Sequence, residues 1–297
     1  MTDVPVKQQD DTDEKPTIGD QAAELLRDVR SKRRRFSRVK NLLAKIEGKK
    51  PKVDDYETWL EVRQKLDGYE LGVAEIDEAR EVLVTRIGTL IDRMAIKKRM
   101  KFSTKLDTLL STRGLEVEKI SESPLVLYIE PLTFEVDFDG GSCKLLFGHE
   151  PIDELALDAD AIVETHEATV ARLNDESVDS EQFFELLHAA YRTVLVADGG
   201  EPGERVDLVD VLVPMAMLRA DRDALRKKGP GAMEPFERHL LAYQLAQLRS
   251  DGLLERDGVR LDLGAATGGS TKDKKDVLYI PVGATGGQYY RALRFES

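Results

Sequence analysis

Apolar and polar positions alternate with two different periods along the chain, and the first of these periods is helical. Between residues 18 and 47, apolar side chains recur at alternating spacings of three and four, which is typical of a coiled-coil seam. A longer seam of the same kind predicts a second helix over residues 54–110. Gly48 and Pro51 between the two segments indicate a helix end and a turn. We therefore expect an antiparallel coiled-coil helical hairpin over residues 17–113.

The second seam extends well beyond the length of the first, so its C-terminal half has no partner within the hairpin. We expect this half to bind another protein or a second copy of the chain. The apolar side chains expected to make that contact are Leu83, Ile87, Leu90 and Met94.

After Gly114 the period of the apolar positions changes to two. Residues 132–138 alternate cleanly between large apolar and polar side chains, which predicts a half-buried strand. Asp139, Gly140 and Gly141 then form a strong hairpin signal. The pattern predicts a small antiparallel sheet with helices over residues 114–200. The expected strands are 115–120, 125–130, 132–138 and 143–147, and the helices expected after them are 159–173, 180–196 and 206–227.

The end of the chain combines a helix with further strands. A broad apolar stripe predicts a helix over residues 234–249. Strands are expected at 258–264 and 277–281, paired around a loop rich in Gly, Ser and Lys, with a final strand at 289–295. Helix, turn and basic-tipped hairpin in this order resemble the recognition helix and wing of a winged-helix domain. The predicted fold class is therefore α+β and mostly helical, with a winged-helix-like domain at residues 201–297.

This resemblance implies contact with DNA or with a partner protein. In winged-helix domains the recognition helix often lies in the major groove, where Arg and Gln side chains reach base edges. Lysines on the wing contact phosphates. Winged-helix domains also serve as protein-docking modules. The residues expected to contact nucleic acid are Arg238, Gln244, Gln247 and Arg249 on the helix and Lys272, Lys274 and Lys275 on the wing.

A formal net charge of −12 confines any nucleic-acid contact to local basic patches. Two basic runs interrupt the acidic background, at residues 30–38 and 96–101. The first run should face acidic residues of the second helix, so ion pairing between helices and nucleic-acid contact are about equally expected there. The second run lies beyond the hairpin overlap, and its Lys97, Lys98 and Arg99 are the favoured contact residues.

The sequence contains no recognisable catalytic motif. Its four histidines and single cysteine form no metal-ligand spacing, and no glycine-rich stretch is followed by the Lys-Ser/Thr of a nucleotide loop. Asp137, Asp139 and Lys144 only faintly resemble a nuclease arrangement. We expect no cofactor and no metal. Residues 1–16 are polar and acidic, which predicts a disordered tail, and no long apolar run indicates a membrane span, so a cytoplasmic location is expected.

These observations favour a non-enzymatic, DNA-associated adaptor in a prokaryotic multi-protein complex. A helical N-terminal region followed by a winged domain is similar, in element order, to subunits that bridge coiled-coil ATPases in chromosome maintenance and in plasmid or phage defence. A dimeric winged-helix transcription regulator is the first alternative, in which the hairpin would form the dimer. A component of a nuclease with an unrecognised catalytic site is the second.

Overall fold

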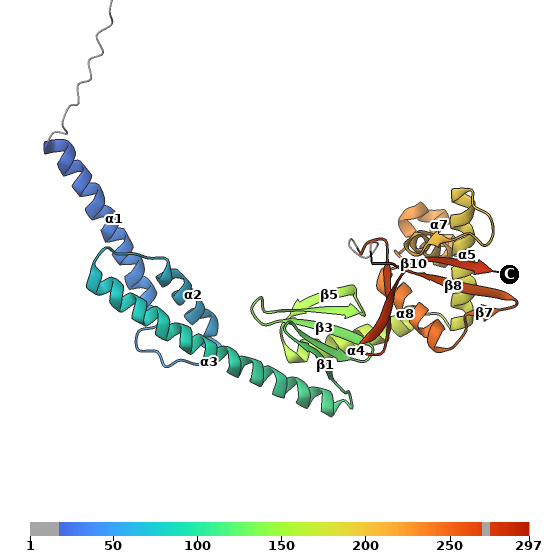
Figure 1. The fold of residues 1–297 in the computed structure, drawn as a ribbon, viewed down its shortest axis with the longest axis horizontal. Coiled ribbons are helices and arrows are strands. Elements are labelled where there is room, and N and C mark those ends of the chain that lie inside the picture. The colour runs from blue at the N-terminus through green and yellow to red at the C-terminus, as the bar shows by residue number, and fades with distance from the viewer. Residues whose placement is uncertain (1–17, 269–273, 297) are drawn as a thin grey trace, which may run out of the picture. The chain divides into compact units, whose positions relative to one another are not determined.

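The protein has a mixed α+β fold with two compact units, as a computed structural model describes it for residues 18–268 and 274–296. Unit 1 ends at Lys101, and unit 2 begins at Phe102 (Figure 1). The expected disordered tail over residues 1–16 lies outside the described residues. No described helix is both long enough and apolar enough to cross a bilayer.

Unit 1 is built from helices, as the sequence predicts, but the second expected helix is interrupted. Residues 68–73 form a turn that separates α2 from α3, where Gly72 adopts a φ of +71°. The Asp77 carboxylate accepts hydrogen bonds from the backbone N–H groups of Leu71, Gly72 and Val73, at 2.9, 2.9 and 3.2 Å. Prediction of one continuous helix over residues 54–110 was therefore wrong. The elements of unit 1 are α1 (Ile18–Ala44), the short 3-10 helix η1 (Val53–Asp55), α2 (Tyr56–Asp67) and the first part of α3 (Ala74–Thr112).

The break in the helix also explains Arg80, a charged residue at an otherwise apolar position of the predicted seam. Arg80 donates from Nη1 to the carbonyl oxygens of Leu66 and Asp67, at 3.0 and 3.3 Å, and so satisfies groups that the end of α2 leaves without helical partners. The core of unit 1 then forms where α2 packs against α3 and against the second half of α1. Its buried side chains are Val39, Leu42, Trp59, Val62, Leu66, Leu71, Val84, Ile87, Ile91 and Met94.

The first sheet of unit 2 is antiparallel and follows chain order, β1-β2-β3-β4-β5. The expected alternation at β3 is confirmed, since Leu132, Phe134 and Val136 are buried and Glu135 is exposed. The fifth strand was not predicted, because Glu150–Ala156 carries an acidic and only partly buried pattern typical of an edge. The strands are β1 (Glu118–Glu122), β2 (Leu125–Ile129), β3 (Leu132–Asp137), β4 (Ser142–Phe147) and β5 (Glu150–Ala156).

The helices after this sheet begin as the sequence predicts and then depart from it. Asp158 and Asp179 cap α4 and α5 by accepting hydrogen bonds from backbone N–H groups of the first turns. The expected single helix over residues 206–227 is instead a strand and several short helices. These elements are α4 (Ala159–Glu176), α5 (Ser180–Asp198), β6 (Val206–Asp207), η2 (Leu208–Val211), α6 (Leu212–Arg219), α7 (Arg222–Lys228), η3 (Gly229–Ala232) and α8 (Arg238–Ser250).

The second sheet has the order β6-β10-β8-β7, with β9 paired to β10. The expected hairpin between residues 258–264 and 277–281 was wrong, because β8 pairs with the second half of β10 and β9 pairs with its first half. The final strand does join the same sheet, as expected. Its strands are β7 (Glu255–Arg256), β8 (Val259–Ala265), β9 (Leu278–Val282) and β10 (Gly286–Glu296).

One continuous core joins the two sheets and the helices of unit 2. It draws buried side chains from both sides of residue 200, which include Phe134 of the first sheet, Leu187 of α5, Leu241 of α8 and Leu293 of the second sheet. The first sheet therefore does not form a core separate from that of the C-terminal elements. This arrangement decides which polar side chains of α8 remain accessible.

Candidate functional site

The strongest concentration of positive charge lies on α1. Between residues 29 and 40 seven residues are basic and none is acidic: Arg30, Lys32, Arg33, Arg34, Arg35, Arg38 and Lys40. We call these seven side chains the α1 basic surface. All seven are exposed, and none forms an ion pair with a carboxylate among the described residues.

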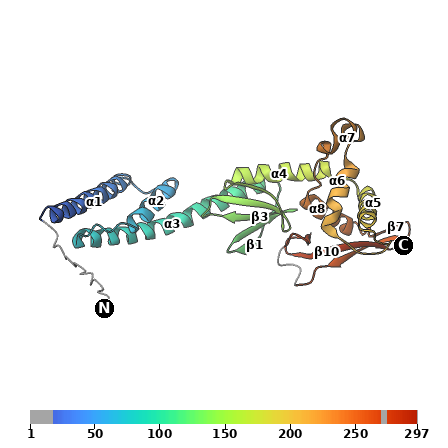
Figure 2. The same cartoon turned by 90° about the horizontal axis from the view of Figure 1, so that it is seen from above.

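The geometry of the helix presents these cations together. Arg30, Arg34 and Arg38 follow one another at i,i+4 spacing and form a row along α1. The helix packs through Val39 and Leu42, while every residue from 21 to 35 is exposed. Figures 1 and 2 show the N-terminal end of α1 extending away from α2. No other described element of unit 1 covers this surface, so a ligand can reach it.

Two of the acidic residues expected to neutralise this run, Glu61 and Asp77, are engaged elsewhere. Glu61 binds Lys45 and Lys65 at 2.9 and 2.6 Å, and these two ammonium groups lower the pKa of Glu61 to about 2. Asp77 caps the turn before α3, and those backbone hydrogen bonds, led by the one from Leu71, lower its pKa. Ion pairing between the helices was one of the two interpretations of this run. In the structure its cations form no ion pair with a carboxylate among the described residues.

The second basic run, on α3, is more strongly neutralised than the first. Lys98 lies 3.4 Å from Glu57 and 5.0 Å from the ring centre of Tyr56, and Lys101 lies 3.5 Å from Asp54. Lys97 and Arg99 lie on the exposed side of α3. The carboxylates beside Lys98 and Lys101 reduce the net positive charge of this run, and contact of Lys97, Lys98 and Arg99 with nucleic acid stays a prediction.

The predicted partner-binding residues of α3 lie against its own neighbours. Ile87 and Met94 are 2% and 4% exposed and belong to the core of unit 1, while Leu83 and Leu90 pack partly buried against that core. Exposed apolar side chains are found in the first half of α1, where Leu25 and Val29 are 66% and 55% exposed, and farther along α3, where Ile96 and Met100 are 59% and 65% exposed. Unpartnered apolar side chains are therefore present on both helices, but not at the four predicted positions.

The α8 helix, expected to read bases, is largely buried. Gln244 is 2% exposed and donates from Nε2 to the carbonyl oxygen of Val178 at 3.1 Å. Tyr243 packs edge-on against Phe147 of β4, with ring centres 5.3 Å apart. The first sheet and α4 thus cover much of the surface that a recognition helix would offer to DNA.

Arg238, at the start of α8, holds the end of the loop before β9 in place. Its Nε lies 2.7 Å from Oε2 of Glu150, a carboxylate from β5 that is only 5% exposed. The same guanidinium donates to the carbonyl oxygens of Lys274, Lys275 and Val277. In this conformation Arg238 and Gln244 have structural roles in place of the expected contacts with bases.

The loop predicted to form the wing is described only in part. Lys272 lies outside the described residues, while Lys274 and Lys275 are exposed at the end of the loop before β9. Their backbone carbonyls are fixed by Arg238, so their side chains project from an anchored segment. Two of the three expected wing cations are thus placed where a phosphate could reach them.

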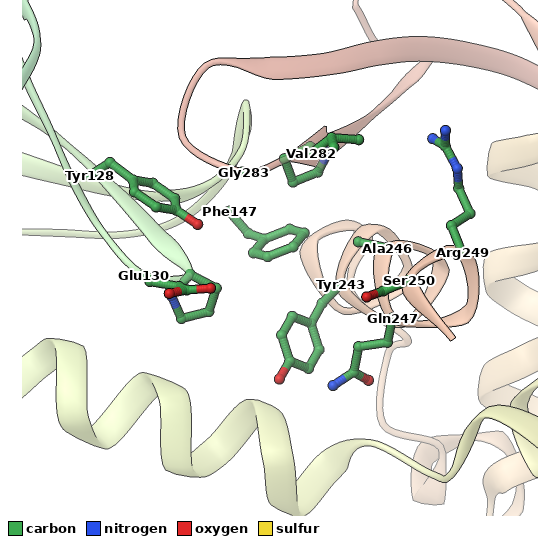
Figure 3. Close-up of a pocket in the computed structure, with 12 residues that line it drawn as sticks. Tyr128, Glu130, Phe147, Tyr243, Ala246, Gln247, Arg249, Ser250, Val282 and Gly283 are labelled. Atoms are coloured by element: carbon green, nitrogen blue, oxygen red, sulfur yellow. The ribbon is translucent and has the colours of Figure 1, made fainter. Parts of the chain in front are cut away.

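The other two predicted residues of α8, Gln247 and Arg249, line a pocket of about 420 Å³ within unit 2. Figure 3 shows Phe147 and Tyr243 at its centre, with Tyr128 and Glu130 on one side and Arg249 on the other. The lining residues are Tyr128, Glu130, Pro131, Phe147, Tyr243, Ala246, Gln247, Arg249, Ser250, Pro281, Val282 and Gly283.

The sequence signal for this pocket was incomplete. Gln247 and Arg249 were singled out because they lie off the apolar stripe of α8, but Tyr128, Glu130 and Ser250 were missed. These residues come from segments far apart in the chain, and no local pattern brings them together.

Asp137, one of the residues that faintly resemble a nuclease arrangement, has a structural role. Oδ1 of Asp137 accepts hydrogen bonds from the N–H groups of Asp139 and Gly140, at 3.0 and 2.8 Å, which shapes the turn between β3 and β4. Cys143 is buried, and burial raises the pKa of its thiol to about 12, so it is a poor nucleophile. Among the described residues no group of three or more His, Cys, Asp or Glu side chains could hold a metal ion.

Comparisons with protein-family models, with curated proteins and with solved structures gave no match to this chain.

Proposed function

We propose that the protein is a non-enzymatic, DNA-associated adaptor that holds DNA by its phosphate backbone through the α1 basic surface. The observation that carries this proposal is the set of seven exposed cations without carboxylate partners among the described residues. In a chain with a net charge of −12, such a surface costs self-repulsion and attracts polyanions. Each lysine or arginine placed against a phosphate releases counterions, which drives binding at low salt.

Backbone contact is favoured over base reading. Arginine side chains on an exposed helix reach phosphates without a fixed orientation, so they give affinity but little sequence preference. The burial of Gln244 and the engagement of Arg238 remove two of the side chains expected to reach base edges. We therefore expect attachment that depends strongly on salt and weakly on sequence.

The winged-helix interpretation is kept as part of this proposal. The order α5, β6, α6, α8, β8 and β10, with β6 and β8 both paired to β10, supports such a domain with α7 and η3 inserted before α8. Because its helix α8 is covered, we propose that this domain docks proteins, with Lys274 and Lys275 as secondary contacts to DNA.

The adaptor part of the proposal rests on the first half of α1. Most of the stability of a helix in a protein comes from packing of its apolar face, and Leu25 and Val29 of this face are 66% and 55% exposed in the described chain. We propose that this end of α1 joins a coiled-coil partner in a prokaryotic multi-protein complex. A coiled-coil ATPase of chromosome maintenance or of plasmid or phage defence is one such partner.

The test measures binding of the full chain to short duplex DNA of arbitrary sequence by fluorescence anisotropy over a range of salt concentrations. Replacing Arg30, Arg33, Arg34 and Arg38 together by Gln should weaken binding at low salt roughly ten-fold or more, and should reduce the slope of log K against log salt by up to about 4. A second duplex of unrelated sequence should give the same affinity.

The matched control replaces Lys97, Lys98, Arg99 and Lys101 by Gln, which removes the same number of charges from α3. Since Lys98 and Lys101 already face carboxylates, this variant should lose less affinity and less slope. Equal losses in both variants would mean that net charge alone is measured. Absence of DNA binding by the parent protein would overturn the proposal.

A further inference from the structure

The pocket beside α8 is lined by polar side chains that form few contacts with the rest of the fold. Tyr128, Glu130, Gln247, Arg249 and Ser250 line it, and none of these side chains has a hydrogen bond or an ion pair with another described residue. The guanidinium of Arg249 lies over the ring of Tyr290, 5.4 Å from its centre, and its Nη1 has no hydrogen-bond partner among the described residues. Donors and acceptors without protein partners around an apolar floor point to a ligand.

The interior of the pocket is apolar and rigid. Phe147 and Tyr243 form its floor, and both are buried in the core of unit 2. Pro131 and Pro281 stand on the walls beside Val282, a valine that is 61% exposed. The hydroxyl of Tyr243 donates to Oδ1 of Asn174 at 2.9 Å, so the ring is held in place. The volume of about 420 Å³ is in the range of pockets that hold a ligand or a peptide side chain.

We propose that this pocket binds an extended, acidic peptide segment of a partner protein, which inserts an apolar side chain against Phe147 and Tyr243 and pairs a carboxylate with Arg249. The hydroxyl of Tyr128 and the amide of Gln247 are available for the backbone of such a peptide. Figure 3 places Arg249 and Glu130 at opposite sides of the pocket, so the charge pattern suits a chain with its acidic group at one end only.

A nucleic acid fits this pocket less well. A polyanion would pair with the single arginine but would also face the Glu130 carboxylate, and tight phosphate binding uses several cations. The pocket is independent of the α1 basic surface, which lies in unit 1. The two proposals can therefore fail separately.

The test screens the full chain against short synthetic peptides that carry one apolar residue (Leu, Val, Phe or Pro) and one Asp at varied spacing. A matched set carries Lys in place of Asp, and an oligothymidylate represents nucleic acid. Binding is measured by fluorescence anisotropy. We expect Asp peptides to bind, with at least roughly ten-fold preference over their Lys counterparts. The reason is that only the Asp carboxylate can accept a charge-assisted hydrogen bond from Arg249.

Two variants separate binding at this pocket from general effects. Arg249→Glu should lose the Asp peptides and gain the Lys peptides, a change of preference that misfolding cannot produce. Val282→Glu, at an exposed position on the wall, should weaken Asp peptides roughly ten-fold, whereas Val213→Glu on the exposed side of α6 is the matched control without effect. Both pocket variants should retain duplex DNA as the parent does.

The proposal is overturned if no peptide of either set binds, or if Arg249→Glu leaves the preference unchanged. It is equally overturned if the oligothymidylate competes with the peptides for the pocket. The α1 variant should lose DNA binding and keep peptide binding, because the pocket and the α1 basic surface lie in different units.

Discussion

The helices α1 and α8 share one design in the sequence and have opposite surroundings in the fold. Both combine an apolar stripe with Arg or Gln side chains off the stripe, and α8 was expected to reach DNA bases, while nucleic-acid contact and ion pairing were about equally expected for α1. In the structure, residues 21–35 of α1 are exposed throughout, while eight residues of α8 are buried, including Gln244 and His239. The polar face of a helix can therefore be assigned to a ligand only after its neighbours are known.

The comparison also separates two uses of arginine. Arg238 pairs with the buried carboxylate of Glu150 and donates to three carbonyl oxygens, so its charge is neutralised within the fold. Arg30 and Arg34 have no such partner among the described residues, and their charge remains available. Four measurements test this contrast between α1 and α8.

The largest effect is expected from Arg238→Ala. Removing the guanidinium leaves Glu150 buried without its counter-charge and frees the carbonyls of Lys274, Lys275 and Val277, which should cost about 4 kcal/mol of the free energy of unfolding. Denaturant unfolding followed by circular dichroism measures it. Arg226→Ala, which breaks an exposed pair with Asp223, is the control and should cost less than about 1 kcal/mol. Similar costs for both would remove the distinction between the two kinds of arginine.

The next effect concerns the apolar stripes. Leu241→Ala on α8 removes a fully buried side chain and should destabilise unit 2 by about 3 kcal/mol. Leu25→Ala on α1, at a side chain 66% exposed, should change stability by less than about 0.5 kcal/mol. Thermal and denaturant unfolding of the two variants would measure this difference. A large cost for Leu25→Ala in the isolated chain would show that α1 already has a partner.

The third effect depends on pH and reports on the burial of α8. Burial, assisted by the charge of Arg172, lowers the pKa of His239 from 6.5 to about 4. The neutral form is therefore favoured in the folded state, and the stability it contributes is present above about pH 6.5 and declines as the pH falls toward 4. The decline should amount to roughly 2 to 3 kcal/mol and should be absent in His239→Gln, as unfolding at a series of pH values would show. An unchanged decline in the variant would assign it to other groups.

The smallest effect tests the repulsion within the α1 basic surface. Arg34→Glu places a carboxylate at i,i+4 spacing from both Arg30 and Arg38, which should stabilise the helix by about 0.5 kcal/mol or slightly more. The same change should weaken binding to duplex DNA. Helix content by circular dichroism and DNA affinity should therefore move in opposite directions. If helix content and DNA affinity change in the same direction, α1 must change its structure to bind DNA.

The sequence predicted the elements that local chemistry determines. The alternation of residues 132–138 and the turn residues Asp139, Gly140 and Gly141 identified the strands β3 and β4 and their connection. The break before α3 was missed because apolar residues continue the seam through it at Tyr69, Val73 and Ile76, while the Asp77 carboxylate that fixes the turn resembles an ordinary surface charge. A pattern of spacing does not show which carboxylate will cap a turn.

The candidate sites were predictable only in part for a related reason. The cations of α1 were recognised from the sequence, but their freedom depends on where Glu61 and Asp77 bind. The burial of Gln244 depends on Val178, a residue far away in the chain. Likewise, β10 pairs with β8, β9 and β6. The strands β8 and β9, which were expected to pair with each other, therefore each pair with β10. Such contacts are set by tertiary packing and leave no local signal.

The edge of β9 has a consequence for the behaviour of the chain at high concentration. Among the described strands β9 pairs only with β10, so its other side resembles an open edge. Two residues of the strand point their backbone nitrogens outward: Tyr279, whose N–H donates to Glu150 at 3.3 Å, and Pro281, which has no N–H. A strand from a neighbouring molecule would find no free donor there. The side of the sheet nearest the pocket therefore resists growing into intermolecular aggregates.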